Sequence, residues 1–297
     1  MDIRIILNGK KAGLETVRQS VSAARALGGV EIRVTWESGD AARLVEEAVG
    51  EGCKRLVAGG GDGSVNEIVN ALMRFPQHER PELAILPLGT ANDFANSCDI
   101  PSSMHEAIAL AQTGTAKSVD CARANENYFI NVASAGFGAL VTANTPVGLK
   151  NFLGGGAYTL SGLVQALSFV PYRGLMLLPE EIVDGDVIVG GVCNGRQAGG
   201  GQQLAPTALI DDGLLDIVGL HPFPATSVGR VVSELGAVET NGTYVRRFRV
   251  PWAEFVSDEI MPVNLDGEPI QQKQVRFEAI PAAVKLVVPD DCEMLVR

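Results

Sequence analysis

A glycine-rich turn at residues 59–67 carries the groups in this sequence best suited to chemistry. It follows the apolar run 56–58 and precedes a helical pattern, so its backbone N–H groups lie at the positive end of a helix dipole. Such a turn is a site for phosphate, because glycine lets the backbone approach an anion. Asp62 would repel a bare phosphate, which indicates that a divalent cation belongs to the site. The turn reads Gly59-Gly60-Gly61-Asp62-Gly63-Ser64-Val65-Asn66-Glu67.

Two better-known phosphate-binding motifs do not match this turn. A Walker A loop ends in Gly-Lys-Ser or Gly-Lys-Thr, and residues 59–67 contain no lysine. The dinucleotide motif needs a third glycine where this chain has Ser64. A strand-to-helix turn without any ligand stays open as an alternative, since glycine-rich turns are common in α/β domains.

The first 125 residues alternate short apolar runs with helical patterns, which is typical of a parallel sheet wrapped by helices. We therefore predict a doubly wound, Rossmann-like α/β domain over residues 1–125. Ligands of such sheets bind at the carboxyl ends of the strands, so Asn8, Thr35, the 59–64 turn and residues 87–92 should converge on one crevice. The predicted strands are 3–7, 31–35, 55–58, 84–86 and 118–122, and the predicted helices are 13–27, 40–50, 64–74 and 103–112.

The character of the chain changes after residue 125, where short β-rich runs are separated by Gly, Asp and Pro. This spacing predicts an antiparallel β-sandwich over residues 126–288. Two helices should interrupt it, near 157–169 and 224–236. The predicted strands are 129–133, 187–192, 215–220, 247–250, 255–257, 262–265, 275–279 and 283–288.

Further motifs carry a resemblance to a known family. The segment Leu86-Pro87-Leu88-Gly89-Thr90-Ala91-Asn92-Asp93-Phe94-Ala95 follows another apolar run, and four more motifs appear in order along the chain. Together with the 59–67 turn they resemble the diacylglycerol-kinase catalytic domain, shared with sphingosine kinases, and most closely the bacterial YegS-type lipid kinases. Ser64 stands where the family usually has Thr, and the hydroxyl is kept. The other motifs are residues 34–42, 194–201, 211–216 and 265–268.

The resemblance implies an enzyme that uses ATP and Mg²⁺ to phosphorylate a lipid hydroxyl. It also implies that residues 289–297 return to pack on the first domain. For Glu67, a capping role three residues after Ser64 stays open beside nucleotide contact. The implied nucleotide contacts are Thr35, Gly61, Asp62, Gly63, Ser64, Val65, Asn66, Glu67 and Thr90.

Glu268 is the proton acceptor that the resemblance implies. It follows Asp266-Gly267, a dipeptide typical of a two-residue hairpin turn. From the pattern alone, Asp266 would serve only to make the turn, and Glu268 would be an exposed carboxylate.

A cation site is implied for residues 209–214. The resemblance assigns a Mg²⁺ ion, with Ca²⁺ as an alternative, to the carbonyl groups of Leu209 and Leu214 and the side chain of Asp212. Without the resemblance, the Asp212-Gly213 dipeptide predicts a turn before the next strand. Asp93 is a further candidate for contact with the cation that accompanies ATP, with helix capping as its alternative.

Two segments are candidates for lipid contact. The apolar stripe of helix 157–169 could receive acyl chains, although such stripes are usually part of a core. Residues 244–252 mix arginines with aromatic side chains, as a headgroup interface does, and an ordinary strand explains this mixture nearly as well.

Composition limits the partners. The net charge of −11 argues against nucleic acid and against long-range attraction to anionic membranes. Five cysteines without a C-x-x-C pair, and an N-terminus without a signal peptide, predict a cytoplasmic protein that is at most peripheral at the inner membrane face. A homodimer is left open.

The sequence does not select the lipid. Phosphatidylglycerol or a diacylglycerol-like glycerolipid is our preference, and sphingoid bases also offer a hydroxyl group. A kinase acting on NAD, which shares the Gly-Gly-Asp-Gly turn, and a non-catalytic nucleotide or lipid sensor remain as alternatives.

Overall fold

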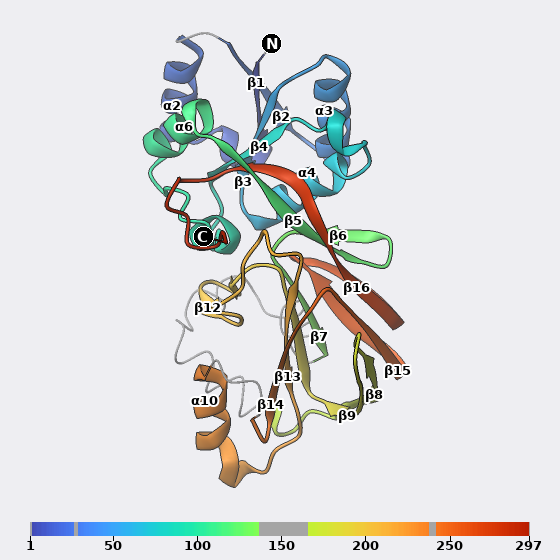
Figure 1. The fold of residues 1–297 in the computed structure, drawn as a ribbon. Helices are drawn as coiled ribbons and strands as arrows, with labels where there is room; N and C mark the ends of the chain where they lie inside the picture. The colour runs from blue at the N-terminus through green and yellow to red at the C-terminus, as the bar shows by residue number, and fades with distance from the viewer. Residues whose placement is uncertain (1, 27–28, 137–165, 238–241, 297) are drawn as a thin grey trace.

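The structure, a computed structural model, describes residues 2–26, 29–136, 166–237 and 242–296. The first part of the chain alternates strands and helices, as its sequence predicts (Figure 1). In order, its elements are β1 (Ile3–Asn8), α1 (Gly9–Ala12), α2 (Glu15–Ala26), β2 (Val30–Thr35), α3 (Asp40–Gly50), β3 (Arg55–Gly60), α4 (Asp62–Leu72), η1 (Gln77–Glu79), β4 (Glu82–Pro87), α5 (Asp93–Ser97), α6 (Met104–Thr113) and β5 (Ala116–Ala124).

Four parallel strands in the order β4-β3-β1-β2 form the centre of this part. Successive side chains of a strand point to opposite faces, and β1 shows the consequence. Ile5 and Leu7 pack with α2 and α6, while Ile6 packs with α3 and α4. The sheet is therefore covered by helices on both faces (Figure 1). This confirms the predicted doubly wound α/β architecture.

The second part of the chain is mainly antiparallel, and the predicted β-sandwich class is confirmed. Its inner face buries a core of its own, with Phe129, Phe277 and Val275 at the centre. Its elements are β6 (Asn127–Phe129), β7 (Val132–Gly136), β8 (Tyr172–Leu177), β9 (Ile182–Val187), β10 (Val189–Cys193), β11 (Gln197–Ala198), β12 (Gln202–Gln203), β13 (Leu215–Leu220), η2 (Ala225–Ser227), α10 (Val228–Gly236), β14 (Val245–Val250), β15 (Trp252–Leu265) and β16 (Glu268–Val287).

Strand β16 connects the two parts. It pairs with β15 from Glu268 to Glu278, then with β5, and its Leu286 lies beside Leu83 of β4 in parallel. The two parts consequently share one continuous sheet (Figure 1). The tail after β16 packs into the first part, where Cys292 and Met294 are buried. The division at residues 125 and 126 stays a prediction.

Several predicted boundaries were wrong. The helix predicted at 13–27 is α2, which runs from 15 to 26. The short helix α1 before it was not predicted; its N-cap is Asn8, whose side chain accepts a hydrogen bond from Lys10 N. Helix α4 begins at Asp62 and not at Ser64. The strand predicted at 129–133 is interrupted after Phe129, and 187–192 belongs to β9 and β10.

The four strands predicted from 255 to 288 are pieces of β15 and β16, and β8 was not predicted at all. The helix predicted at 157–169 lies mostly outside the described residues.

Candidate active site

The amino end of α4 presents the backbone groups expected of a phosphate site. Gly61 is the N-cap, and the first hydrogen bond of the helix runs from Val65 N to Gly61 O at 3.1 Å. The N–H groups of Asp62, Gly63 and Ser64 therefore precede the helical ladder and are available to an anion. A Cβ on Gly63 would meet nothing within 4 Å, so space lies open in front of this turn.

The second predicted loop, 87–92, packs directly on this turn. Gly61 and Gly89 touch so closely that a Cβ on Gly89 would lie 2.5 Å from the Cα of Gly61. Leu88 N donates to Gly60 O at 2.8 Å, and the Asp62 carboxylate accepts a hydrogen bond from Phe94 N at 3.1 Å. Asp62 thus caps α5 with one oxygen, and this contact joins the two motifs.

Polar groups from the neighbouring strand ends lie beside this turn. Asn8, at the end of β1, donates from Nδ2 to Ser64 Oγ at 3.0 Å. Thr35, at the end of β2, lies opposite Asn8 and accepts from Gly9 N at 3.3 Å. Thr90 is exposed on the 87–92 loop. The predicted convergence of strand ends is therefore observed for Asn8, Thr35 and the turn.

Glu268 sits at the end of a tight hairpin. Leu265 pairs with Glu268, and the two residues between them, Asp266 and Gly267, have φ angles of 49° and 105°. Positive φ at both positions is what a two-residue hairpin needs, and Asp-Gly supplies it at low cost. Glu268 is exposed at the first position of β16.

Asp266 does more than make this turn. Its carboxylate accepts hydrogen bonds from Ile130 N and Val132 N, both at 2.7 Å, and from Asn131 N at 3.1 Å. These amides lie where the predicted strand 129–133 is interrupted. Burial raises the pKa of Asp266 to about 6, against the lowering effect of the three amides. The hairpin is thereby fastened to the segment between β6 and β7.

Two contacts bring the hairpin to the glycine-rich turn. The buried Asn66 side chain donates to Leu265 O at 3.4 Å, across 199 positions of sequence. Desolvation, and then the nearby carboxylate of Glu268, raise the pKa of Glu67. The hairpin that carries Glu268 therefore lies beside the first turns of α4.

Two of the predicted nucleotide contacts have groups that the structure uses elsewhere. Val65 is a core residue, 3% exposed, and its N–H is used within the helix. The Asn66 side chain bonds to the hairpin and to Asn70, so it is not free for a nucleotide. For Glu67 the structure excludes the capping alternative, because α4 begins five residues before it, and contact with the nucleotide stays a prediction.

The glycine loop 199–201 is a part of the site that sequence reasoning did not assign. Asp93 is 5% exposed, and its carboxylate accepts from Gly200 N at 2.9 Å and Gly201 N at 2.7 Å. Both glycines have positive φ. Asp93 is thus not a capping residue, and burial raises its pKa. The run of three glycines was the available signal, but only the structure shows its partner.

Comparison with known proteins agrees with this geometry. Residues 2–124 match the model described as "Diacylglycerol kinase catalytic domain", and residues 131–288 match "YegS C-terminal NAD kinase beta sandwich-like domain". A protein of Shewanella frigidimarina named "Probable lipid kinase YegS-like" is 50% identical over 297 residues, covering 99% of this chain and 96% of its own. The chain belongs to the YegS-like lipid kinases.

Other relatives extend this assignment. A protein of Chromohalobacter salexigens with the same name is 44% identical, covering 99% of this chain and 95% of its own. A crystal structure titled as a diacylglycerol kinase from Bacillus anthracis has the same fold, with a TM-score of 0.77 at 21% identity and 98% of both chains covered.

At 209–214, where the family resemblance implies a cation, the Asp212 side chain is paired within the protein, and the cation site stays a prediction. The Asp212 carboxylate forms an ion pair with Arg249 and accepts from Leu214 N at 2.9 Å. Among the described residues, no group of three or more His, Cys, Asp or Glu side chains is placed to hold a metal. A guanidinium group supplies the positive charge at Asp212.

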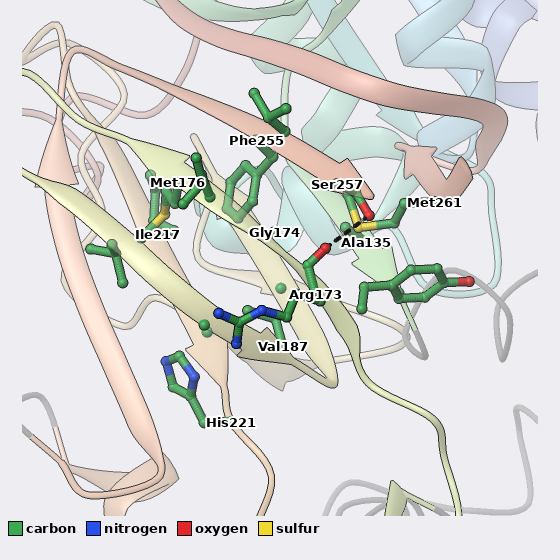
Figure 2. Close-up of a pocket in the computed structure, with 18 of the residues that line it drawn as sticks. Ala135, Arg173, Gly174, Met176, Val187, Ile217, His221, Phe255, Ser257 and Met261 are labelled. Carbon is green, nitrogen blue, oxygen red and sulfur yellow. Dashed lines mark hydrogen bonds between the residues drawn. The ribbon is translucent and has the colours of Figure 1, made fainter. Parts of the chain in front are cut away.

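An apolar pocket lies in the second part of this kinase, between β8, β9, β13 and β15 (Figure 2). It measures about 690 Å³ when the part open to solvent is included. Arg173 and His221 lie at its polar edge (Figure 2). The other labelled side chains that line it are Met176, Val187, Ile217, Phe255, Ser257 and Met261.

The arginine-rich segment 244–252 is better explained as a strand. Arg247 donates to Leu204 O and Leu235 O, Arg249 pairs with Asp212, and Arg246 stacks on Phe248. In the helical stripe, the described residues Leu167 and Phe169 pack in a core cluster. None of the described helices combines the length and apolar content needed to cross a bilayer.

Proposed function

We propose that this lipid kinase transfers the γ-phosphoryl group of ATP to the hydroxyl group of a glycerolipid, with Mg²⁺ accompanying the nucleotide. The observation that carries this proposal is the bond from Asn66 to Leu265 O, which holds the Glu268 hairpin against the amino end of α4. A phosphate-binding helix end and a carboxylate base are the two parts that phosphoryl transfer requires.

In this mechanism the N–H groups of Asp62, Gly63 and Ser64 bind the phosphates. The oxygen of the lipid hydroxyl bonds to the γ-phosphorus, and Glu268 accepts the proton that this hydroxyl loses. The bond from that phosphorus to the β,γ-bridging oxygen breaks, and ADP leaves with the electron pair. The products are a lipid phosphate, ADP and a protonated Glu268, which returns its proton to water.

Mg²⁺ fits the donor groups of this site. Mg²⁺ in kinases is held by one or two carboxylates together with phosphate oxygens and water. Asp62 uses one carboxylate oxygen to cap α5, and the other oxygen could hold the ion. When bound, the ion neutralises phosphate charge that would otherwise be repelled by Asp62, Glu67 and Glu268.

The apolar pocket supports a lipid as the acceptor. Its lining is predominantly apolar, as the lining of a site for acyl chains should be. It reaches Met261 on β15, and the four residues from there to Leu265 span about 14 Å of strand. Acyl chains in the pocket would leave the glycerol hydroxyl to extend toward Glu268. We infer that the enzyme acts peripherally, at the inner membrane face.

The test is a transfer assay with γ-³²P-labelled ATP, Mg²⁺ and micelles of phosphatidylglycerol, diacylglycerol or sphingosine. We expect label in a glycerolipid. Glu268→Gln should lower turnover by about 10²–10⁴-fold, the usual contribution of a general base, and leave ADP affinity unchanged. The exposed Glu180 offers a matched control, because Glu180→Gln should retain full turnover.

A second acceptor belongs in the same assay. Residues 131–288 match a family whose description compares its β-sandwich with that of NAD kinase. Label appearing in NADP, with none in any lipid, would replace the lipid proposal by a NAD kinase. Binding of ADP without transfer to any acceptor would leave a nucleotide sensor.

A further inference from the structure

Trp36 is the most exposed large apolar side chain among the described residues, at 92%. It directly follows Thr35, the last residue of β2, at the edge of the sheet where the phosphate-binding turn lies. Strands β2 and β3 are separated only by β1, so the two strand ends are about 10 Å apart. An indole at that distance from the phosphates is placed where the ribose and base of a nucleotide would extend.

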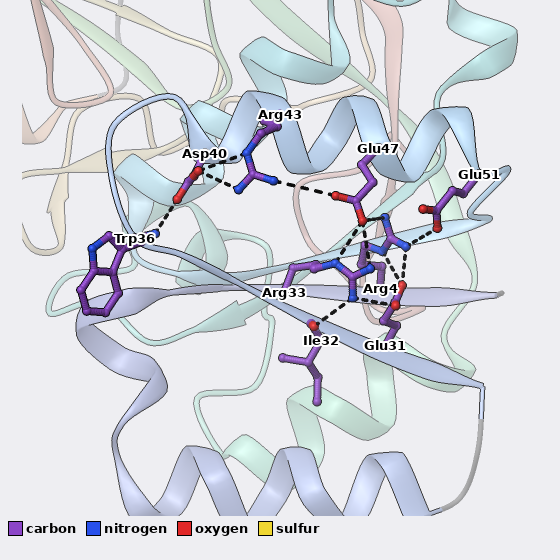
Figure 3. Close-up of polar contacts among 9 residues, drawn as sticks. All are labelled: Arg4, Glu31, Ile32, Arg33, Trp36, Asp40, Arg43, Glu47 and Glu51. Carbon is purple, nitrogen blue, oxygen red and sulfur yellow. Dashed lines mark hydrogen bonds and ion pairs between the residues drawn. The ribbon is translucent and has the colours of Figure 1, made fainter.

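The backbone around Trp36 is held rigidly. The Asp40 carboxylate accepts hydrogen bonds from Trp36 N at 2.7 Å and from Glu37 N at 3.1 Å (Figure 3). Its other oxygen pairs with Arg43 at 2.8 Å. These contacts fix the loop while the indole points away from them (Figure 3). The backbone of this loop is therefore fixed, while the apolar indole ring is exposed to solvent. Exposure of an apolar ring is energetically unfavourable.

A network of charges braces the helix that carries Asp40. Arg4 of β1 is only 1% exposed and pairs with Glu31 of β2 and with Glu47 and Glu51 on the α3 side (Figure 3). Arg33 bridges Glu31 and Glu47. Helix α3 is thus tied to β1 and β2, which fixes Asp40 relative to the strand ends.

In the part of the chain that the structure describes, the two sides of the turn differ in what lies against them. Toward β4, Gly61 and Gly89 are in contact, and the Asp93 carboxylate is held by Gly200 N and Gly201 N. This side is closed by protein. Toward β2, Gly9 and Trp36 are exposed. With the γ-phosphate directed at Glu268, the exposed β2 side is where we place the base.

We propose that the indole of Trp36 stacks on the purine base of ATP and so contributes to nucleotide affinity. This inference rests on the proposed function, since it takes the α4 amides as the phosphate site. Base–aromatic stacking tolerates any base, so Trp36 supplies affinity and leaves discrimination between purines weak.

Fluorescence tests the inference directly, because the chain has only two tryptophans, Trp36 and Trp252. In Trp252→Phe the remaining emission comes from Trp36, and saturating Mg²⁺-ADP should quench it strongly. In Trp36→Phe the emission comes from Trp252, which lies beneath Arg276 at 4.2 Å and should not respond. Calorimetry on the same samples measures ADP binding independently.

Kinetics give a second readout. Trp36→Ala should raise the KM for ATP about tenfold, as expected for loss of one stacked base, and leave the KM for the lipid unchanged. Trp36→Phe, which keeps a ring, should restore most of the affinity.

The possible failures are distinguishable. ADP binding in the calorimeter without quenching in Trp252→Phe would overturn the stacking proposal and leave the kinase assignment intact. Absence of ADP binding would overturn both. Emission that responds to phosphatidylglycerol vesicles and not to ADP would also overturn stacking, and would make Trp36 a membrane contact.

Discussion

Two of the Asp-Gly dipeptides in the chain, Asp212-Gly213 and Asp266-Gly267, are predicted to form turns next to strands, and the structure uses their carboxylates in different ways. Asp266-Gly267 forms a true hairpin turn, and its carboxylate is held by three neutral backbone amides. Asp212-Gly213 lies in a loop, and its carboxylate is paired with the Arg249 guanidinium. The Asp266 carboxylate fixes the hairpin near the glycine-rich turn, whereas the Asp212 carboxylate is paired with a cationic side chain in the second part of the chain.

The comparison shows that the role of an aspartate carboxylate depends on the groups that donate hydrogen bonds to it, and not on the Asp-Gly dipeptide in which it occurs. Amides orient a carboxylate without cancelling its charge, whereas a guanidinium does both. Asp266 can therefore fasten the Glu268 hairpin and still contribute negative potential near Asp62. A cation at Asp212 would have to displace the Arg249 guanidinium.

The largest expected effect is that of Asp266→Ala. This change removes the acceptor of three backbone N–H groups and should lower the free energy of unfolding by roughly 3 kcal/mol, since each unpaired buried donor costs about 1–3 kcal/mol. Urea unfolding monitored by circular dichroism measures it. Asp258→Ala, at an exposed position of β15, is the control and should change stability by less than about 0.5 kcal/mol. Equal midpoints for the two variants would show that Asp266 is only a turn residue.

A smaller effect is expected from Arg249→Gln. With the guanidinium removed, Asp212 should become available to Mg²⁺, and millimolar MgCl₂ should raise the melting temperature of this variant by roughly 2–4 °C per kcal/mol of binding energy. The unaltered protein, without nucleotide, should show no rise. Differential scanning fluorimetry with and without EDTA makes the measurement.

The contrary result for the 209–214 loop is equally clear. If Mg²⁺ stabilises the unaltered protein and EDTA reverses this, a cation displaces Arg249. The site implied by the family resemblance would then be present in this chain.

The smallest effect is expected at Asp40, whose carboxylate is bound both by backbone amides and by a guanidinium group. Arg43, together with the amides of Trp36 and Glu37, lowers the pKa of Asp40 to about 2. A group with a lowered folded pKa stabilises the fold above its unfolded pKa, near 4, and this stabilisation is lost as pH falls from about 4 to 2. Asp40→Asn should flatten the fall in melting temperature across that window. An unchanged acid profile would mean that Asp40 is not tightly held.

Local patterns were enough to predict much of the fold. Helix α3 and strand β13 lie where the sequence placed them, because each buries one regular apolar face. The interruption after Phe129 could not be predicted, since its cause is Asp266, more than 130 positions away. The same holds for the early start of α4, where packing of Gly61 on Gly89 shapes the turn.

The sequence likewise predicted some parts of the candidate site and missed others. The glycine-rich turn and the Asp266-Gly267 hairpin follow from composition, and the resemblance supplied the role of Glu268. The partner of Asp93, the pairing of Asp212 with Arg249 and the exposure of Trp36 depend on contacts between distant segments. Local sequence patterns do not show which distant segments are in contact. The roles of the site residues stay predictions.

The central claim is that free backbone amides at the start of α4 bind the phosphates of ATP, and Gly63→Ala tests it most directly. A Cβ at this helical position meets open space, so the variant should fold with an unchanged or higher melting temperature. The same Cβ would stand where the phosphates bind, and calorimetry should show the Kd for Mg²⁺-ATP raised about tenfold or more. A folded Gly63→Ala protein that binds ATP as tightly as the unaltered chain would contradict the account.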